Sequence, residues 1–170
     1  MPTAELFAST RPLRPSVSAR ADELFLTHQR DIYCHTDRMF PYLMGVQWMA
    51  GVAFALLVAP RTWSGASSQT HVHVWAAIVL GGTISLFPAL LAAYRPGQAS
   101  TRYIVATAQM MMSALLIHLT GGRIETHFHV FGSLAFLAFY RDWRVLIPAT
   151  VVMALDHMLR GVDRPHSEYG

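Results

Sequence analysis

The stretch 116–131, LIHLTGGRIETHFHVF, sets ionisable side chains between two apolar segments of the chain. The first apolar segment runs into His118, and a pair of glycines follows it. Four ionisable residues then come before the chain turns apolar again: Arg123, Glu125, His127 and His129. Ionisable groups at membrane depth are rare, and they usually mark functional sites. The stretch therefore predicts a hairpin between two membrane helices that carries a candidate site.

The composition is typical of a membrane protein. Of the 170 residues, 53% are hydrophobic and 14% are charged, whereas a soluble domain carries about 25% charged residues. All 13 basic residues are arginines, and they separate long apolar blocks instead of forming one basic patch. We therefore expect the lipid bilayer as a partner and no nucleic acid.

The apolar blocks predict an all-α fold, a polytopic membrane bundle of about five transmembrane helices after an N-terminal juxtamembrane helix. Residues 1–40 are expected to form a cytoplasmic tail (1–20) and an amphipathic juxtamembrane helix (21–40). Residues 41–160 would form the transmembrane domain and 161–170 an extracytoplasmic end. The expected spans are 41–60, a block from 71 to 94, 103–122, 126–140 and 145–155, with a loop from residue 60 to the second span.

The arginines also predict the orientation of the chain. With the N-terminus in the cytoplasm, nine arginines fall in cytoplasmic segments and four in outer segments, as the positive-inside rule requires. Five spans would leave the C-terminus outside. We therefore expect the natural protein to continue into a sixth span.

This topology brings ionisable residues from four helix ends to the extracytoplasmic side. They are six histidines and two carboxylates: His71, His73, His118, Glu125, His127, His129, Asp156 and His157. Neutral imidazoles with carboxylates suit Zn²⁺, Cu²⁺ or Fe²⁺. The ligands we expect first are His118, His129 and His157. Glu125, His127 and Asp156 would be further ligands or would orient a ligand, with His71 and His73 nearby.

Helix geometry limits which histidines can share one site. Residues two apart on a helix point about 200° apart, so only one of His127 and His129 can face a shared site if both are helical. Glu125 then shares a face with His129, but an extended chain at Thr126 would align it with His127. The same choice applies to His71 and His73. Other interpretations are histidines that cap helices or bond carbonyls, a haem b between facing histidines, and a metal-free proton sensor.

The chain resembles a family of bacterial membrane proteins over residues 37–170. The segments HVHVWAAIVLGG and ALLIHLTGGRIETHFHVFGSLAFLAFYRDWRVLIPAT, with the pair Asp156-His157, resemble the multi-pass N-terminal membrane region of sensor histidine kinases and related chemoreceptors. The resemblance implies a sensory input module in the bacterial inner membrane. It would report to a cytoplasmic signalling output domain that this chain lacks, and we expect it to act as a homodimer.

We therefore predict a membrane-embedded sensory input domain of the histidine-kinase type, with a metal site at the extracytoplasmic helix ends. No catalytic residue is expected in this chain, because kinase activity would lie in a C-terminal region outside it. The alternative is a membrane-embedded, histidine-ligated metalloenzyme or haem-binding protein that uses the same cluster. Such an enzyme needs an open coordination position and a path for its substrate.

Overall fold

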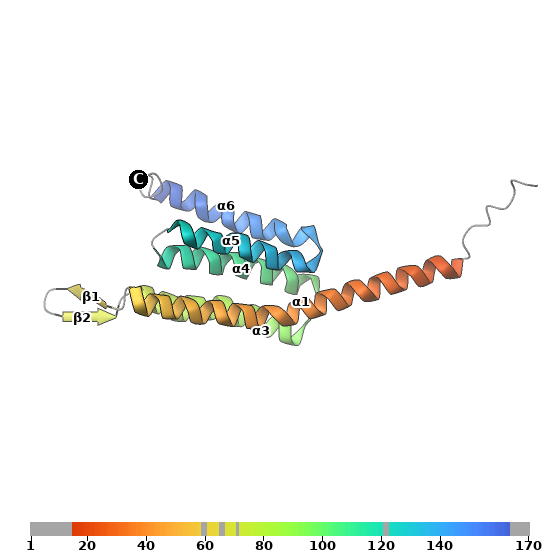
Figure 1. Ribbon diagram of the computed structural model, residues 1–170, viewed down its shortest axis with the longest axis horizontal. Helices are drawn as coiled ribbons and strands as arrows, with labels where there is room; N and C mark the ends of the chain where they lie inside the picture. Colours follow the sequence, from red (N-terminus) through yellow and green to blue (C-terminus); the bar gives the residue numbers. More distant parts are fainter. Residues whose placement is uncertain (1–14, 59–60, 65–66, 71, 121–122, 164–170) are drawn as a thin grey trace, which may run out of the picture.

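The chain folds into a bundle of long helices (Figure 1). The computed structural model describes residues 15–58, 61–64, 67–70, 72–120 and 123–163. The long helices are α1 (Pro15–Val58), α3 (Gly81–Tyr94), α4 (Ala99–Leu119), α5 (Ile124–Leu137) and α6 (Leu146–Asp163). The all-helical class is thereby confirmed, with one short hairpin as the exception.

A β-hairpin follows α1 where the sequence predicted a loop. Strand β1 (Arg61–Ser64) pairs antiparallel with β2 (Ser67–Thr70). Threonine and tryptophan favour strands, and the polar character of both strands suits a place beyond the apolar helices. The short helix α2 (Val72–Trp75) and the π-helical turn η1 (Ala76–Leu80) then lead directly into α3. The second apolar block is therefore one helical segment that ends at Tyr94.

Helix α1 crosses the boundary that the sequence placed between residues 40 and 41. It begins at Pro15, inside the expected tail, and continues through Pro41 to Val58. An interior proline removes one helical hydrogen bond and usually bends or ends a helix. Here Phe40 and Met44 beside it are fully buried, so packing against the bundle holds the helix together. The first part of α1 extends beyond the other helices (Figure 1).

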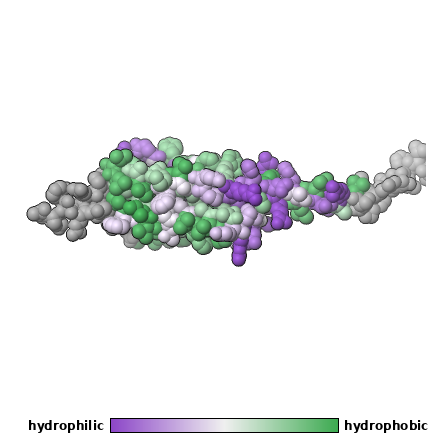
Figure 2. Space-filling model, turned by 90° about the horizontal axis from the view of Figure 1, so that it is seen from below, coloured by the Kyte–Doolittle hydropathy of each residue, from purple (hydrophilic) through white to green (hydrophobic). Residues whose placement is uncertain are grey.

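Among the residues that the structure describes, four helical segments are long and apolar enough to cross a membrane. They are Val17–Leu57, Ala76–Tyr94, Ala99–Leu119 and Trp143–Val162. On the face shown in Figure 2, apolar residues lie over the body of the bundle among residues of intermediate hydropathy, and polar residues gather where α1 leaves it. These features are consistent with a membrane protein. The number of spans and the orientation remain predictions.

Helix α4 lies at the centre of the bundle and packs against α1, α3, α5 and α6. Two buried clusters flank it. One includes Met44, Ala77 and Met112, and the other includes Phe40, Val105 and Tyr140. Because α4 contributes to both, it links the first half of the bundle to the second.

The antiparallel order of the helices defines two ends of the bundle. The proximal end is where α1 emerges, and it holds the connections 95–98 and 141–142 (Figure 1). The distal end holds the β-hairpin, the end of α4, the start of α5 and the end of α6. The candidate site residues divide between these two ends.

Candidate functional site

Two histidines from neighbouring helices meet toward the distal end. His127 on α5 and His157 on α6 have ring centroids 5.8 Å apart in an edge-to-face arrangement. The Nδ1 atom of His127 lies 3.1 Å from the carbonyl oxygen of Arg123, and that of His157 lies 3.0 Å from the carbonyl oxygen of Met153. A carbonyl oxygen can only accept, so each Nδ1 carries the hydrogen. In the neutral rings both Nε2 atoms therefore hold a lone pair.

His129 faces a different neighbour. Its Nδ1 atom lies 2.8 Å from Oγ of Ser113 on α4 and 3.3 Å from Oγ of Ser133. Gln109 Nε2 donates to Ser133 Oγ over 2.9 Å. Gln109, Ser113 and Ser133 are all buried. The buried atoms His129 Nε2 and Gln109 Oε1 have no hydrogen-bond partner among the described residues. A buried polar group without a hydrogen bond lowers the stability of the fold. The stability of the contact between α4 and α5 therefore depends on the hydrogen bonds within this polar cluster.

The structure resolves the geometric choice at the start of α5. The helix begins at Ile124, so both His127 and His129 are helical and point to different neighbours. Glu125 is exposed and pairs with Arg123 at 3.4 Å. Its own backbone N–H in the first helical turn, followed by the Arg123 guanidinium, lowers the pKa of Glu125. The carboxylate therefore stays ionised at this end of α5.

The remaining predicted site residues take separate positions. Asp156 accepts two hydrogen bonds from Arg160, at 2.8 and 3.0 Å, and Arg160 Nη2 also donates to the carbonyl oxygen of Ala114 over 2.9 Å. This arrangement joins α6 to α4. His118 is an exposed residue of α4. His73 lies in α2, and His71 lies outside the described residues.

The expected ligand set is not gathered in one place. His129 faces α4, His157 faces His127, and His118 is exposed. Within the described ranges, no three His, Cys, Asp or Glu side chains are grouped so that they could hold a metal ion. The pair His127 and His157 is the part of the set that the fold brings into contact, and metal binding remains a prediction.

A buried carboxylate occupies the proximal end, and the sequence analysis did not identify it. Asp37 on α1 is fully buried. Its Oδ1 accepts from the Tyr140 hydroxyl and its Oδ2 from the Gly97 N–H, both over 2.6 Å. The Tyr140 ring also stacks on Phe40, with centroids 5.5 Å apart. One indication of this site was present in the sequence, an aspartate shortly before an apolar block. The hydrogen-bond partners of Asp37, however, lie far from it in the sequence.

Arg102 extends this network, and we call Asp37, Gly97, Arg102 and Tyr140 the proximal hub. The Arg102 guanidinium lies 3.6 Å from the centroid of the Tyr33 ring on α1. It also pairs with Asp142 at 3.5 Å and donates to the Gly97 carbonyl oxygen over 3.4 Å. The hub therefore ties α1 to both connections at the proximal end.

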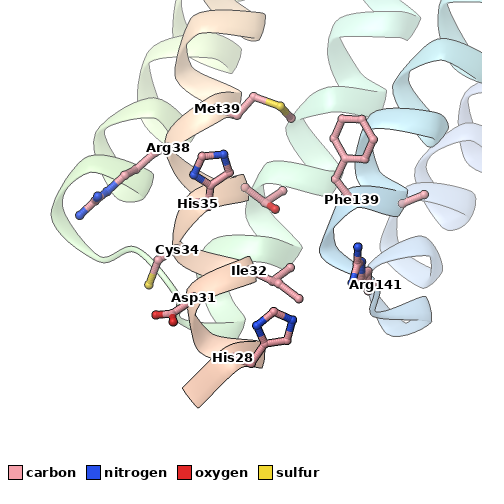
Figure 3. Close-up of a pocket in the computed structure, with 11 residues that line it drawn as sticks. His28, Asp31, Ile32, Cys34, His35, Arg38, Met39, Phe139 and Arg141 are labelled. Atoms are coloured by element: carbon pink, nitrogen blue, oxygen red, sulfur yellow. The ribbon is translucent and has the colours of Figure 1, made fainter. Parts of the chain in front are cut away.

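A groove lies beside the hub, between α1 and the segment 138–141 (Figure 3). It encloses a volume of about 890 Å³. Its α1 side includes His28, Ile32, His35 and Met39, and its other side includes Phe139 and Arg141. The sequence analysis did not predict this groove, because the two sides are distant in the chain.

Comparison with known proteins links the chain to signal transduction. Over 66 residues it is 34% identical to transducer protein Htr8 of Halobacterium salinarum, an alignment that covers 39% of this chain and 10% of the transducer. The chain thus spans about a tenth of the length of that relative. No family model matches the chain, and no solved structure matches it. The similarity supports a sensory or signalling role, and the histidine-kinase assignment stays a prediction.

Proposed function

We propose that the chain is a membrane-embedded sensory module that passes a change in its helix bundle to α1. The observation that carries the proposal is the proximal hub, in which one buried carboxylate, Asp37, is bonded to Gly97 and Tyr140. Helix α1 runs unbroken from this point out of the bundle (Figure 1). The similarity to a transducer protein supports the same role.

Helix α5 provides the path between the two ends. It carries His127 near its first turn, and the 3₁₀ turn η2 (Ala138–Tyr140) continues it to the hydroxyl that bonds Asp37. A helix is stiff over this length, so a shift of α5 against α6 at the histidine pair reaches Tyr140. A ligand that binds one of two such arrangements more tightly would then bias the position of α1.

We further propose that the stimulus is a transition metal ion or a ligand that is bound to such an ion. His127 and His157 would be ligands through Nε2. A ring that donates Nδ1–H to a backbone carbonyl is in the form that metal-binding histidines usually adopt. When bound, the ion would supply a link between α5 and α6. A zinc site normally has four ligands, so the pair alone would be an incomplete set.

The output partner is likewise proposed. A cytoplasmic domain of the histidine-kinase or chemoreceptor type would receive the signal, with the N-terminus of this chain in the cytoplasm of a bacterial cell and the chain acting as a homodimer. The charge bias of the arginines and the transducer similarity support this arrangement.

Amide hydrogen exchange of the protein in lipid nanodiscs tests the proposed coupling. The probes are Zn²⁺, haem and a step to acidic pH, which represent the three possible uses of the histidines. We expect at least one of them to change exchange in α1 near Asp37 and in the connection 95–98. The change in α1 should be lost in Asp37→Asn. If all three probes leave α1 unchanged, or if Asp37→Asn responds like the wild type, the proposal is wrong.

A further inference from the structure

The groove beside the proximal hub is lined by both apolar and polar side chains, which alternate along α1 in the order His28, Ile32, His35 and Met39. Met39 and Phe139 lie toward the bundle body, whereas His28 and Arg141 lie at the outer end (Figure 3). On the face shown in Figure 2, polar residues gather where α1 leaves the bundle. A ligand that fits it has an apolar part toward the bundle and a polar part away from it.

The polar groups that project into the groove favour an anion. His28 and His35 project from α1 between that helix and the segment 138–141, and Arg141 lies on the facing side (Figure 3). The only carboxylate that lines the groove among the described residues belongs to Asp31, and it extends to the opposite flank of α1, as do Cys34 and Arg38 (Figure 3). The lining as a whole carries the guanidinium groups of Arg38 and Arg141, the carboxylate of Asp31 and two imidazoles, so positive charge exceeds negative charge.

Arg141 has a backbone conformation that needs an explanation. Its φ is 53°, which makes it the one non-glycine residue with positive φ in the described part of the chain. A left-handed conformation costs a residue with a side chain about 1 kcal/mol or more. Such residues are common where a helix ends, and here Arg141 ends η2 and its backbone N–H donates to the carbonyl oxygen of Ala138. The Arg141 side chain is exposed, and its guanidinium forms no ion pair with any described residue. The fold thus holds an uncompensated cation at the mouth of the groove.

We propose that this groove binds an anionic phospholipid, with the headgroup phosphate at Arg141 and His28 and an acyl chain along Ile32, Met39 and Phe139. Guanidinium groups bind phosphate oxygens in a bidentate manner, and basic pockets between membrane helices suit lipid headgroups. The apolar wall distinguishes an amphiphile from a free anion. The proposal is independent of what the distal histidines bind.

Native mass spectrometry of the full chain released from detergent micelles tests the proposal. The protein is titrated with phosphatidylglycerol and, separately, with phosphatidylcholine. We expect a preference for phosphatidylglycerol that Arg141→Gly weakens about tenfold or more, because a charge-assisted hydrogen bond is lost. Glycine suits a positive φ, so this variant removes the charge without straining the turn. The matched control is Arg95→Gln, an exposed arginine of the connection 95–98 that is not among the described residues lining the groove, and it should bind like the wild type.

Four other outcomes of these titrations would contradict the proposal. Equal affinity in Arg141→Gly and the wild type would show that the groove does not hold the headgroup. Equal weakening by Arg95→Gln would reduce the effect to general charge attraction. Inorganic phosphate that displaces phosphatidylglycerol at similar concentration would indicate a free-anion site. A shift between monomer and dimer in Arg141→Gly, with unchanged lipid counts, would make the groove an interface between two copies of the chain.

Discussion

The Tyr140 hydroxyl donates a 2.6 Å hydrogen bond to Oδ1 of Asp37, which lies 103 residues earlier in the chain. Both residues are fully buried, and a carboxylate oxygen can only accept a hydrogen bond. The phenol therefore keeps its proton and remains a donor. One hydrogen bond thus joins the helix that leaves the bundle to the connection between α5 and α6.

Tyr140→Phe should lower the free energy of unfolding by about 2 kcal/mol, the usual contribution of a hydrogen bond to a charged group. The ring and its stacking on Phe40 are kept, so the loss reports on the hydroxyl alone. Unfolding by sodium dodecyl sulfate in mixed micelles measures it. Tyr42→Phe is the control, because Tyr42 is 80% exposed. Equal effects of the two substitutions would show that the bond to Asp37 does not stabilise the fold.

Gly97→Ala should destabilise the protein by about 2 kcal/mol or more. Gly97 has a φ of +81°, which costs other residues about 1–2 kcal/mol. A Cβ atom there would also lie 2.7 Å from Sγ of Cys34. Gly132→Ala is the control, because a Cβ at that helical position meets nothing within 4 Å, and alanine there should be neutral or stabilise by up to about 1 kcal/mol. Equal unfolding free energies of the two variants would contradict the described turn at Gly97.

Ser113→Ala should disturb the buried cluster around His129. The substitution removes the hydroxyl 2.8 Å from Nδ1 of His129 and leaves Ser133 at 3.3 Å as the partner. We expect a loss of about 0.5–2 kcal/mol, the range for hydrogen bonds between membrane helices, and a changed ¹⁵N shift of the His129 ring. Ser100→Ala, at an exposed position of α4, should change neither. An unchanged His129 spectrum in Ser113→Ala would disprove the contact.

The sequence predicted the helical class and the alternation of apolar blocks with turns, because these follow from local composition. It also predicted that His127 and His129 cannot share a site if both are helical, and the structure directs them to different helices. Helix boundaries were less accurate. The break expected before Pro41 is absent, because burial of Phe40 and Met44 outweighs the local cost of a proline.

The proximal hub could not have been predicted from local patterns. The partners of Asp37 come from positions 97 and 140, and the choice between them depends on how the helices pack. The same holds for the groove, whose two sides are α1 and the segment 138–141. The predicted topology placed the expected ligands near one end of the bundle, but it could not decide which pairs touch.

Zinc binding should depend on the pair that the fold brings together. We expect His127→Ala and His157→Ala each to weaken Zn²⁺ affinity about tenfold or more, because each ring would supply one ligand. Isothermal titration of the protein in nanodiscs measures this affinity. His28→Ala, on α1 at the proximal end, is the control and should bind zinc like the wild type. If the two distal variants also match the wild type, this pair is not a metal site.

The measurement that tests the central claim most directly is a spin-label distance between α1 and the bundle. Labels are placed at Arg20→Cys and Gln98→Cys, both exposed, in a Cys34→Ser background that removes the native thiol. Double electron–electron resonance in nanodiscs then compares His157→Ala with the wild type, with and without Asp37→Asn. We expect His157→Ala to shift the distance distribution only while Asp37 is intact. The same shift in both backgrounds, or no shift in either, would contradict a distal site that acts on α1 through Asp37.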